Sequence, residues 1–166
     1  MGRFSQLSPD FILKLNELQK LRRKFPDMAG IEAVRFSKQR FIDKNWVDET
    51  AKAWEPRKRK APGSLMVGKG SGRLKRSIRK IRVTQNSVTI GTDVPYAQIH
   101  NEGGTIKKTV SVKSHSRKRK GRSASVKSHR RKMNTTIPQR QFIGESAQLM
   151  HKIEDLIGAE MNLILK

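Results

Sequence analysis

The sequence predicts an α+β fold: a small antiparallel β-sheet packed by N- and C-terminal helices, with a long basic loop or hairpin arm. Three observations support this class. Apolar residues recur at helical spacing near both ends of the chain, apolar and polar residues alternate in its middle, and a long cationic stretch contains no acidic residue. A chain of 166 residues has the size of one domain. We therefore expect a single domain over residues 1–166, with a basic arm inserted at about residues 105–136.

The N-terminal quarter of the chain predicts two helices. Ser8-Pro9-Asp10 combines a capping hydroxyl, a proline suited to a first helical turn and an acid suited to the positive end of the helix dipole. Apolar residues at helical spacing then predict a helix over residues 9–24 that Pro26 ends. Asp27 is expected to cap a second helix that continues to Ile42.

The middle of the chain predicts a loop, a short helical turn and a β-hairpin. Trp46 and Trp54 are interpreted as packing residues at the edge of the core rather than base-stacking residues. Gly, Pro, Ser and basic residues make 56–73 a loop, and Leu74 faces inward from a helical turn over 71–78. The alternation around Gln85-Asn86-Ser87 predicts two antiparallel strands joined by a tight turn.

The C-terminal segment, residues 144–166, predicts one amphipathic helix. Its apolar residues fall on one face at helical spacing. We expect this face to pack on the hairpin sheet and complete a two-layer body.

Charge is concentrated in the arm. The chain carries a formal charge of +23, which favours polyanionic partners. Between Gly103 and Ile143 there are 13 Lys or Arg residues and no Asp or Glu. The arm residues that we expect to contact a neighbouring subunit, another partner or DNA are Lys107, Lys108, Lys113, Arg117, Lys118, Arg119, Lys120, Arg122, Lys127, Arg130, Arg131 and Lys132.

The arm also contains a repeat. Ser-Val-Lys-Ser-His occurs at residues 111–115 and again at 125–129, on either side of a basic segment that contains Gly121. One interpretation is a hairpin whose two strands have the same composition. The other is a disordered basic loop that becomes ordered only against something negative, because an isolated cationic ribbon has little apolar surface to stabilise it.

No catalytic or cofactor site is predicted. The chain has no cysteine, and His115 and His129 lack an acidic partner for a zinc site. His100-Asn101-Glu102 has no second histidine at metal spacing, and the glycine-rich stretch 68–72 lacks the spacing of a phosphate-binding loop. We expect no cofactor and no enzymatic activity. No run approaches the roughly 18 apolar residues of a membrane span, so no membrane partner is expected.

Two motifs flank the arm. Motif A, residues 96–106, begins Tyr-Ala-Gln-Ile-His-Asn-Glu-Gly-Gly, and motif B, residues 137–144, has the sequence Ile-Pro-Gln-Arg-Gln-Phe-Ile-Gly. With the elements around Trp54 and Leu74, they resemble the virion-morphogenesis or tail-completion proteins of Mu-like tailed phages. Ten residues carry this resemblance, and we assign them a structural role. They are Trp54, Leu74, Tyr96, His100, Glu102, Gly103, Gly104, Pro138, Arg140 and Phe142. Tyr96 and Phe142 are interpreted as core residues that can also contribute to a subunit interface.

The resemblance implies a structural α+β subunit that forms a ring, expected to be a hexamer, at the neck of the virion. Such a ring caps the tail tube (the tail terminator, or tail completion, role) and joins it to the head connector after assembly in the bacterial host cytoplasm. The basic arm could then contact a neighbouring subunit, an acidic face of the tube or connector, or packaged DNA, and the sequence does not choose among them. The charge alone supports an alternative: a non-specific nucleic-acid-binding protein of the ribosomal or nucleoid type.

Overall fold

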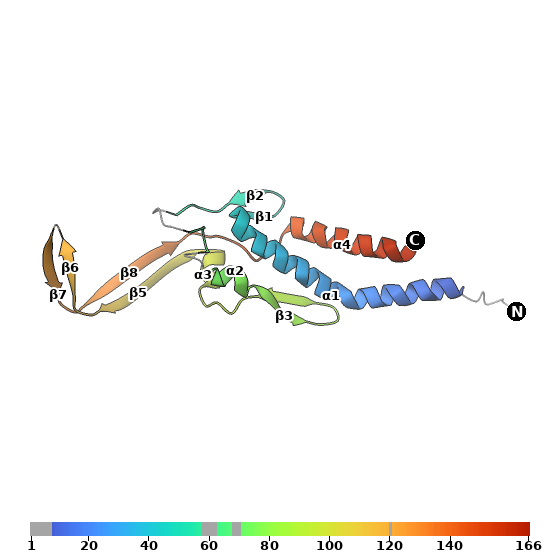
Figure 1. Ribbon diagram of the computed structural model, residues 1–166, viewed down its shortest axis with the longest axis horizontal. Coiled ribbons are helices and arrows are strands. Elements are labelled where there is room, and N and C mark those ends of the chain that lie inside the picture. The colour runs from blue at the N-terminus through green and yellow to red at the C-terminus, as the bar shows by residue number, and fades with distance from the viewer. Residues whose placement is uncertain (1–7, 58–62, 68–70, 120) are drawn as a thin grey trace.

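The structure is a computed structural model that describes residues 8–57, 63–67, 71–119 and 121–166. These residues contain four helices and four two-stranded antiparallel sheets, which confirms the predicted α+β class. Two long helices and a β-hairpin form an elongated body, and a two-part ribbon projects from one end of it (Figure 1). Residues 68–70 of the glycine-rich stretch and Lys120 of the arm lie outside the described residues.

Helix α1 runs without interruption from Pro9 to Asp43. Ser8 caps its start, because Ser8 Oγ accepts a hydrogen bond of 3.2 Å from the Phe11 amide. The prediction that Pro26 ends a first helix was wrong: Pro26 is buried inside α1. A proline within a helix removes a backbone hydrogen bond. Here that cost is offset by packing, because buried positions continue at helical spacing on both sides of it, at Leu21, Gly30, Ala33 and Phe36.

A left-handed residue ends α1 and starts a small two-stranded sheet. Lys44 has φ of 56°, and its amide donates to the Arg40 carbonyl at 2.8 Å. The chain then forms β1 (Asn45–Val47) and β2 (Ala51–Ala53), which pair antiparallel.

The predicted helical turn and hairpin are both present. Helix α2 (Arg73–Ser77) is followed by β3 (Arg79–Val83) and β4 (Val88–Gly91), which pair antiparallel. Leu74 is buried, as the sequence predicts for this turn, and Ile78 after it is buried too. The hairpin lies close to α1 at Gly30 of the helix. A Cβ atom added at Gly30 would lie only 2.6 Å from Val88 Cγ2.

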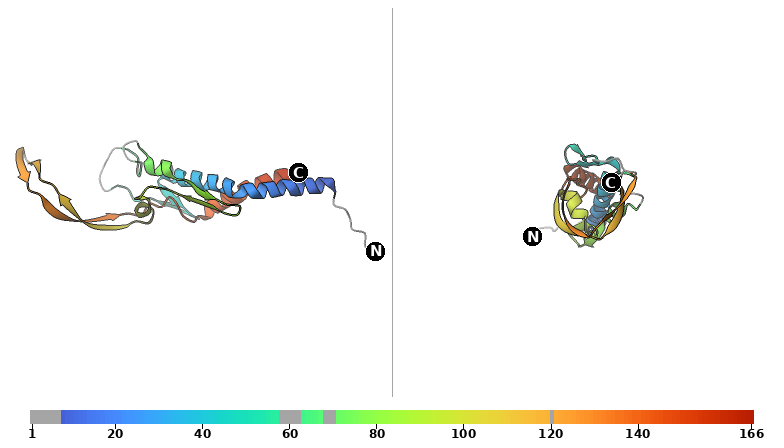
Figure 2. Two further views of the ribbon diagram at one scale, coloured as in Figure 1. Left: turned by 90° about the horizontal axis from the view of Figure 1, so that it is seen from below. Right: turned by 90° about the vertical axis from the view of Figure 1, so that its left-hand side faces the viewer.

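Helix α4 (Ala147–Leu165) packs along α1 (Figure 2). The expectation that its main packing surface is the hairpin sheet was therefore wrong. Leu149 is buried in a cluster with Ala33 and Phe36 of α1 and with Trp46 and Val47 of β1. The apolar face of α4 matches this surface, and Ile90 is the residue of the hairpin that joins the edge of the same cluster.

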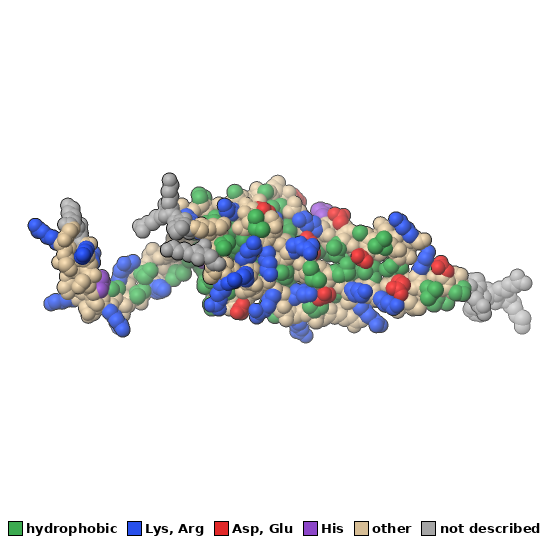
Figure 3. All heavy atoms as spheres, viewed as in Figure 1, with side chains coloured by type: hydrophobic (Ala, Val, Ile, Leu, Met, Phe, Trp, Pro, Cys, Tyr) green, Lys and Arg blue, Asp and Glu red, His purple; other side chains and the backbone are tan. Residues whose placement is uncertain are grey.

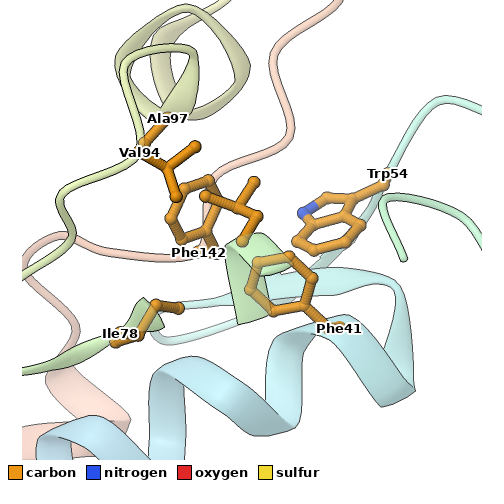
Figure 4. Close-up of a cluster of buried hydrophobic side chains, with 7 residues drawn as sticks. Phe41, Trp54, Ile78, Val94, Ala97 and Phe142 are labelled. Atoms are coloured by element: carbon orange, nitrogen blue, oxygen red, sulfur yellow. The ribbon is translucent and has the colours of Figure 1, made fainter. Parts of the chain in front are cut away.

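A second cluster forms the core next to the arm (Figure 4). The Phe41 ring lies edge-on to Trp54 at 5.5 Å between centroids and tilted against Phe142 at 5.1 Å. Leu74, Ile78 and two residues at and before helix α3 (Ala97–Glu102), Ala97 and Val94, complete it. The core thus joins α1, residues 54–57 (the tryptophan turn), the helical turn before the hairpin and both motifs that flank the arm.

The arm is a hairpin in two parts, which corresponds to the first of the two interpretations of its repeat. In the part next to the body, β5 (Gly104–Val112) pairs with β8 (His129–Ile137) over nine residues on each strand. In the part at the tip, β6 (His115–Arg119) pairs with β7 (Arg122–Val126). We call these the proximal ribbon and the distal ribbon.

Candidate assembly site

Motifs A and B lie side by side at the base of the arm, and Asn101 joins them. Asn101 Oδ1 accepts hydrogen bonds from the amides of Phe142 at 2.9 Å and Ile143 at 3.0 Å. Its Nδ2 donates to the Ile143 carbonyl at 3.0 Å. One side chain of α3 therefore fixes the backbone that leaves the arm and places the Phe142 ring in the core.

Arg140 makes the second connection between the motifs. Its backbone amide donates to the His100 carbonyl at 2.8 Å, and its Nε and Nη2 donate to the Glu55 carbonyl at 3.1 and 2.9 Å. Trp54 Nε1 donates to the Gln141 carbonyl at 2.9 Å. Burial lowers the pKa of the Arg140 guanidinium, an effect that the Glu55 carboxylate opposes. The tryptophan turn and motif B are thus held together by polar bonds around a buried cation.

Gly103 and Gly104 let the chain leave α3 sharply and enter the arm. Gly103 has φ of 75° with ψ of −179°, a conformation that is essentially restricted to glycine. A Cβ atom there would lie 2.8 Å from the Gln139 backbone nitrogen. Gly104 has φ of 142° and starts β5. The close approach of motif B therefore requires glycine at the end of motif A.

His100 lies partly buried beside these bonds. Burial lowers the pKa of its imidazole, and the charge of Arg140 lowers it further. Its Nδ1 atom is buried and has no hydrogen-bond partner among the described residues. A neutral imidazole is the form that this environment favours.

The remaining motif residues have different environments. The core interpretation is right for Phe142, which is 1% exposed, and wrong for Tyr96, which is 44% exposed and contacts His100 edge-on at 5.9 Å. Tyr96 directly precedes α3 and lies at the surface. Glu102 is exposed and accepts a hydrogen bond from Gln98, and Pro138 is half-buried.

The cationic residues of the arm are exposed wherever their side chains are described (Figure 3). The side chain of Arg119 and the whole of Lys120 lie outside the described residues, so their predicted contacts are not placed. The others are Lys107, Lys108, Lys113, Arg117, Lys118, Arg122, Lys127, Arg130, Arg131 and Lys132. The arm thus presents these charges to solvent.

The sequence repeat forms the joint between the two ribbons. Its copies face each other, because Val112 pairs with His129 and His115 pairs with Val126. Both histidines have the same local geometry: each Nδ1 lies 3.0 Å from the carbonyl oxygen two residues earlier, that of Lys113 or Lys127. The pairing is interrupted on both strands at the same level, and the distal ribbon turns away from the proximal ribbon there (Figure 1).

Asn101 is the functional residue that sequence reasoning did not single out. Its position inside a recognised motif was visible, but its three hydrogen bonds join segments about forty residues apart. The available signal was its position two residues before Gly103, since asparagine side chains often form hydrogen bonds with the backbone at turns.

The described residues contain no group of three or more His, Asp or Glu side chains that could hold a metal ion. In the same ranges, no helix combines the length and the apolar character needed to cross a bilayer.

The described residues thus form an α+β body from which a cationic hairpin arm projects. The profile of the phage virion morphogenesis family matches residues 13–162, and the chain belongs to this family. Its members serve virion structure and assembly, which gives this chain a role in the phage virion. No curated protein and no solved structure shows significant similarity to the chain.

Proposed function

We propose that this protein forms a ring at the head–tail junction of the virion and acts there as the tail terminator, or tail completion, protein. The observation that carries the proposal is the joining of motifs A and B, through Asn101 and Arg140, at the base of a projecting arm. This construction holds the arm at a fixed place on each subunit. Repeated around a ring, it presents a set of cationic arms to the neighbouring components.

The partners of the proposed ring are the tail tube on one side and the head connector on the other. The arm suits an acidic protein face or DNA in the channel, because it has no acidic residue between Gly103 and Ile143. The hexameric state follows from the resemblance described above. The proposed role is structural and requires no catalytic residue.

The proposal is tested by the composition of virions and the state of the purified protein. We expect mass spectrometry to detect the protein in purified virions and electron micrographs of the concentrated protein to show closed rings. A protein that stays monomeric at high concentration and is missing from virions contradicts the proposal.

A second candidate function is non-specific nucleic-acid binding, favoured by the distal ribbon. There Arg117, Lys118 and Arg122 lie on a narrow two-stranded ribbon. Its other residues with described side chains are His115, three serines, Ala124 and Val126. A ribbon of this kind fits the major groove of duplex DNA. If this is the main function, the free protein binds duplex tightly, and the logarithm of the affinity falls with the logarithm of salt by about 0.9 for each phosphate neutralised. Absence of binding at low salt contradicts it.

A further inference from the structure

The proximal ribbon has two chemically different faces. Residues paired across an antiparallel ladder lie on the same face, and successive residues alternate between faces. One face carries the apolar residues Ile106, Val110, Val112, Met133 and Ile137, and four polar or charged residues lie among them: Lys108, His129, Arg131 and Thr135. The opposite face carries threonines, Ser111, Asn134 and basic residues.

Beyond its base, where Ile99 of α3 lies next to Gly104, the described residues pack no other helix or strand extensively on the apolar face. Ile106 is 36% exposed, and the other four residues of this stripe are half-buried. Among the described elements, the extensive contacts of β5 and β8 are with each other. A two-stranded hairpin is marginally stable in water unless a further strand or a helix covers it. Phosphates cannot cover Ile, Val and Met side chains, so this face fits a protein surface.

Helix α4 presents a stripe of matching length and chemistry. Met150, Ile157, Met161 and Leu165 recur at helical spacing beside the face that packs on α1. Met150, Met161 and Leu165 are 54%, 37% and 52% exposed. The stripe spans about 22 Å along the helix, and Ile106 to Val112 spans about 20 Å along the strand.

The charges of the two stripes are complementary. Lys108 and Arg131 interrupt the apolar face of the ribbon, and Glu154 interrupts the stripe on α4. Within Ala147–Leu165 the acids Glu154, Asp155 and Glu160 outnumber the one lysine, Lys152. The arm, in contrast, is purely basic.

The two surfaces lie at opposite ends of the elongated subunit (Figure 1). The arm points away from α4, so it cannot reach the α4 of its own chain. We propose that the apolar face of the proximal ribbon docks on the Met150–Leu165 stripe of α4 in a second copy of this chain. Such a contact joins unlike surfaces, so it propagates from subunit to subunit and gives a ring where the rotation between subunits closes. The inference rests on the proposed function, which supplies the second copy.

Site-specific crosslinking tests this contact, and the natural absence of cysteine makes it clean. The test variant carries Val110→Cys and Met161→Cys in one chain and is treated with a short bis-maleimide after assembly. We expect a ladder of covalent oligomers on denaturing gels. Each single variant should give no ladder, and a mixture of the two single variants should give covalent dimers.

The matched control moves the arm cysteine to the polar face. Thr109→Cys with Met161→Cys places the thiol one residue away on the opposite side of the ribbon and should give at least tenfold less ladder. Circular dichroism of each variant checks that it is folded, and Met133→Cys with Met161→Cys serves if the Val110 substitution unfolds the chain.

Charge exchange provides a second readout. Lys108→Glu and Glu154→Lys should each reduce the population of rings about tenfold, and the double variant should restore it, since like charges at an interface disfavour association. Rings that form normally without Val110–Met161 crosslinks overturn the docking but leave the proposed function standing. A protein that never associates overturns both. If added duplex DNA alone protects the Val110→Cys thiol from reaction with the maleimide, nucleic acid covers the apolar face of the proximal ribbon. That result overturns the docking.

Discussion

The side chain of Asn101 satisfies two backbone amides and one carbonyl where the chain returns from the arm. We predict that Asn101→Ala lowers the free energy of unfolding by about 2–4 kcal/mol, because these groups lose their partners in a half-buried environment. Chemical denaturation measures the change. Asn134→Ala, at an exposed position on the arm, is the matched control and should change stability by less than about 0.5 kcal/mol. Equal effects in the two variants contradict the central position given to Asn101.

Gly103 and Gly158 form a pair of glycines with opposite requirements. Gly103→Ala should lower the free energy of unfolding by about 2 kcal/mol or more, since φ of 75° and contact with Gln139 both exclude a side chain. Gly158 lies within α4 with open space around it, so Gly158→Ala should raise stability by about 0.5–1 kcal/mol. Thermal melting of both variants gives the signs directly. A neutral Gly103→Ala means that the backbone can leave α3 in another way.

His100 predicts how stability depends on pH. Its pKa is lowered in the folded protein, first by burial and then by Arg140, from an ordinary value of 6.5. Between the pKa of the folded protein and pH 6.5, the unfolded chain therefore binds more protons than the folded protein does. Stability is retained above pH 6.5 and falls as the pH falls from 6.5 through the folded pKa. Denaturation curves between pH 7.5 and about pH 5 should show this decline. His100→Gln should flatten it, and the exposed control His151→Gln should not.

The strands of the arm pair with one another, and both buried clusters of the body consist of residues outside the arm. We predict that deletion of residues 111–132 leaves a folded subunit and impairs assembly or DNA retention. After the deletion Thr109 and Val110 become the turn between the paired residues Lys108 and Met133, so Thr109→Asn and Val110→Gly are added to suit that turn. Circular dichroism checks the fold, and size-exclusion chromatography checks assembly.

A charge variant separates the two properties of the arm. Arg117→Ser, Lys118→Ser and Arg122→Ser remove charge from the distal ribbon and keep the apolar face of the proximal ribbon. Assembly should survive in this variant if the ribbon docks through apolar contacts. For the deletion of residues 111–132 described above, an unfolded product contradicts the division between body and arm.

Several elements could be predicted from the sequence because their signals are local. The Ser8 cap, the helical turn around Leu74, the hairpin before motif A and the amphipathic C-terminal helix are examples. Two errors concern packing. The break at Pro26 follows from local propensity, but buried residues before and after it fix one continuous helix. The position of α4 depends on which apolar surface remains free, and α1 with β1 offers it.

The site was predictable at the level of motifs but not of contacts. Motif A, motif B and the charge of the arm are visible in the sequence. The bonds of Asn101 join segments far apart in the chain, and Tyr96 is exposed although an aromatic residue usually favours the core. The repeat of the arm predicts similar strands, but its placement at the joint depends on the hairpin register.

One end of the subunit is a cationic ribbon, and the other is a helix pair with exposed apolar residues (Figure 3). A subunit with unlike ends suits head-to-tail assembly. This polarity connects membership of the phage virion morphogenesis family with the proposed ring, and it leaves the distal ribbon free to contact an acidic face or DNA in the channel.

Immunogold electron microscopy of intact virions, with antibodies raised against this protein, tests whether it lies at the head–tail junction. Tails are examined both attached to heads and after separation from them. If the protein forms a ring at the head–tail junction, gold labels the head-proximal end of the tail, and averaged images show a ring-shaped density at the same position. Gold on the capsid shell, along the tail tube or at the distal tip, or virions that carry no gold, would contradict it.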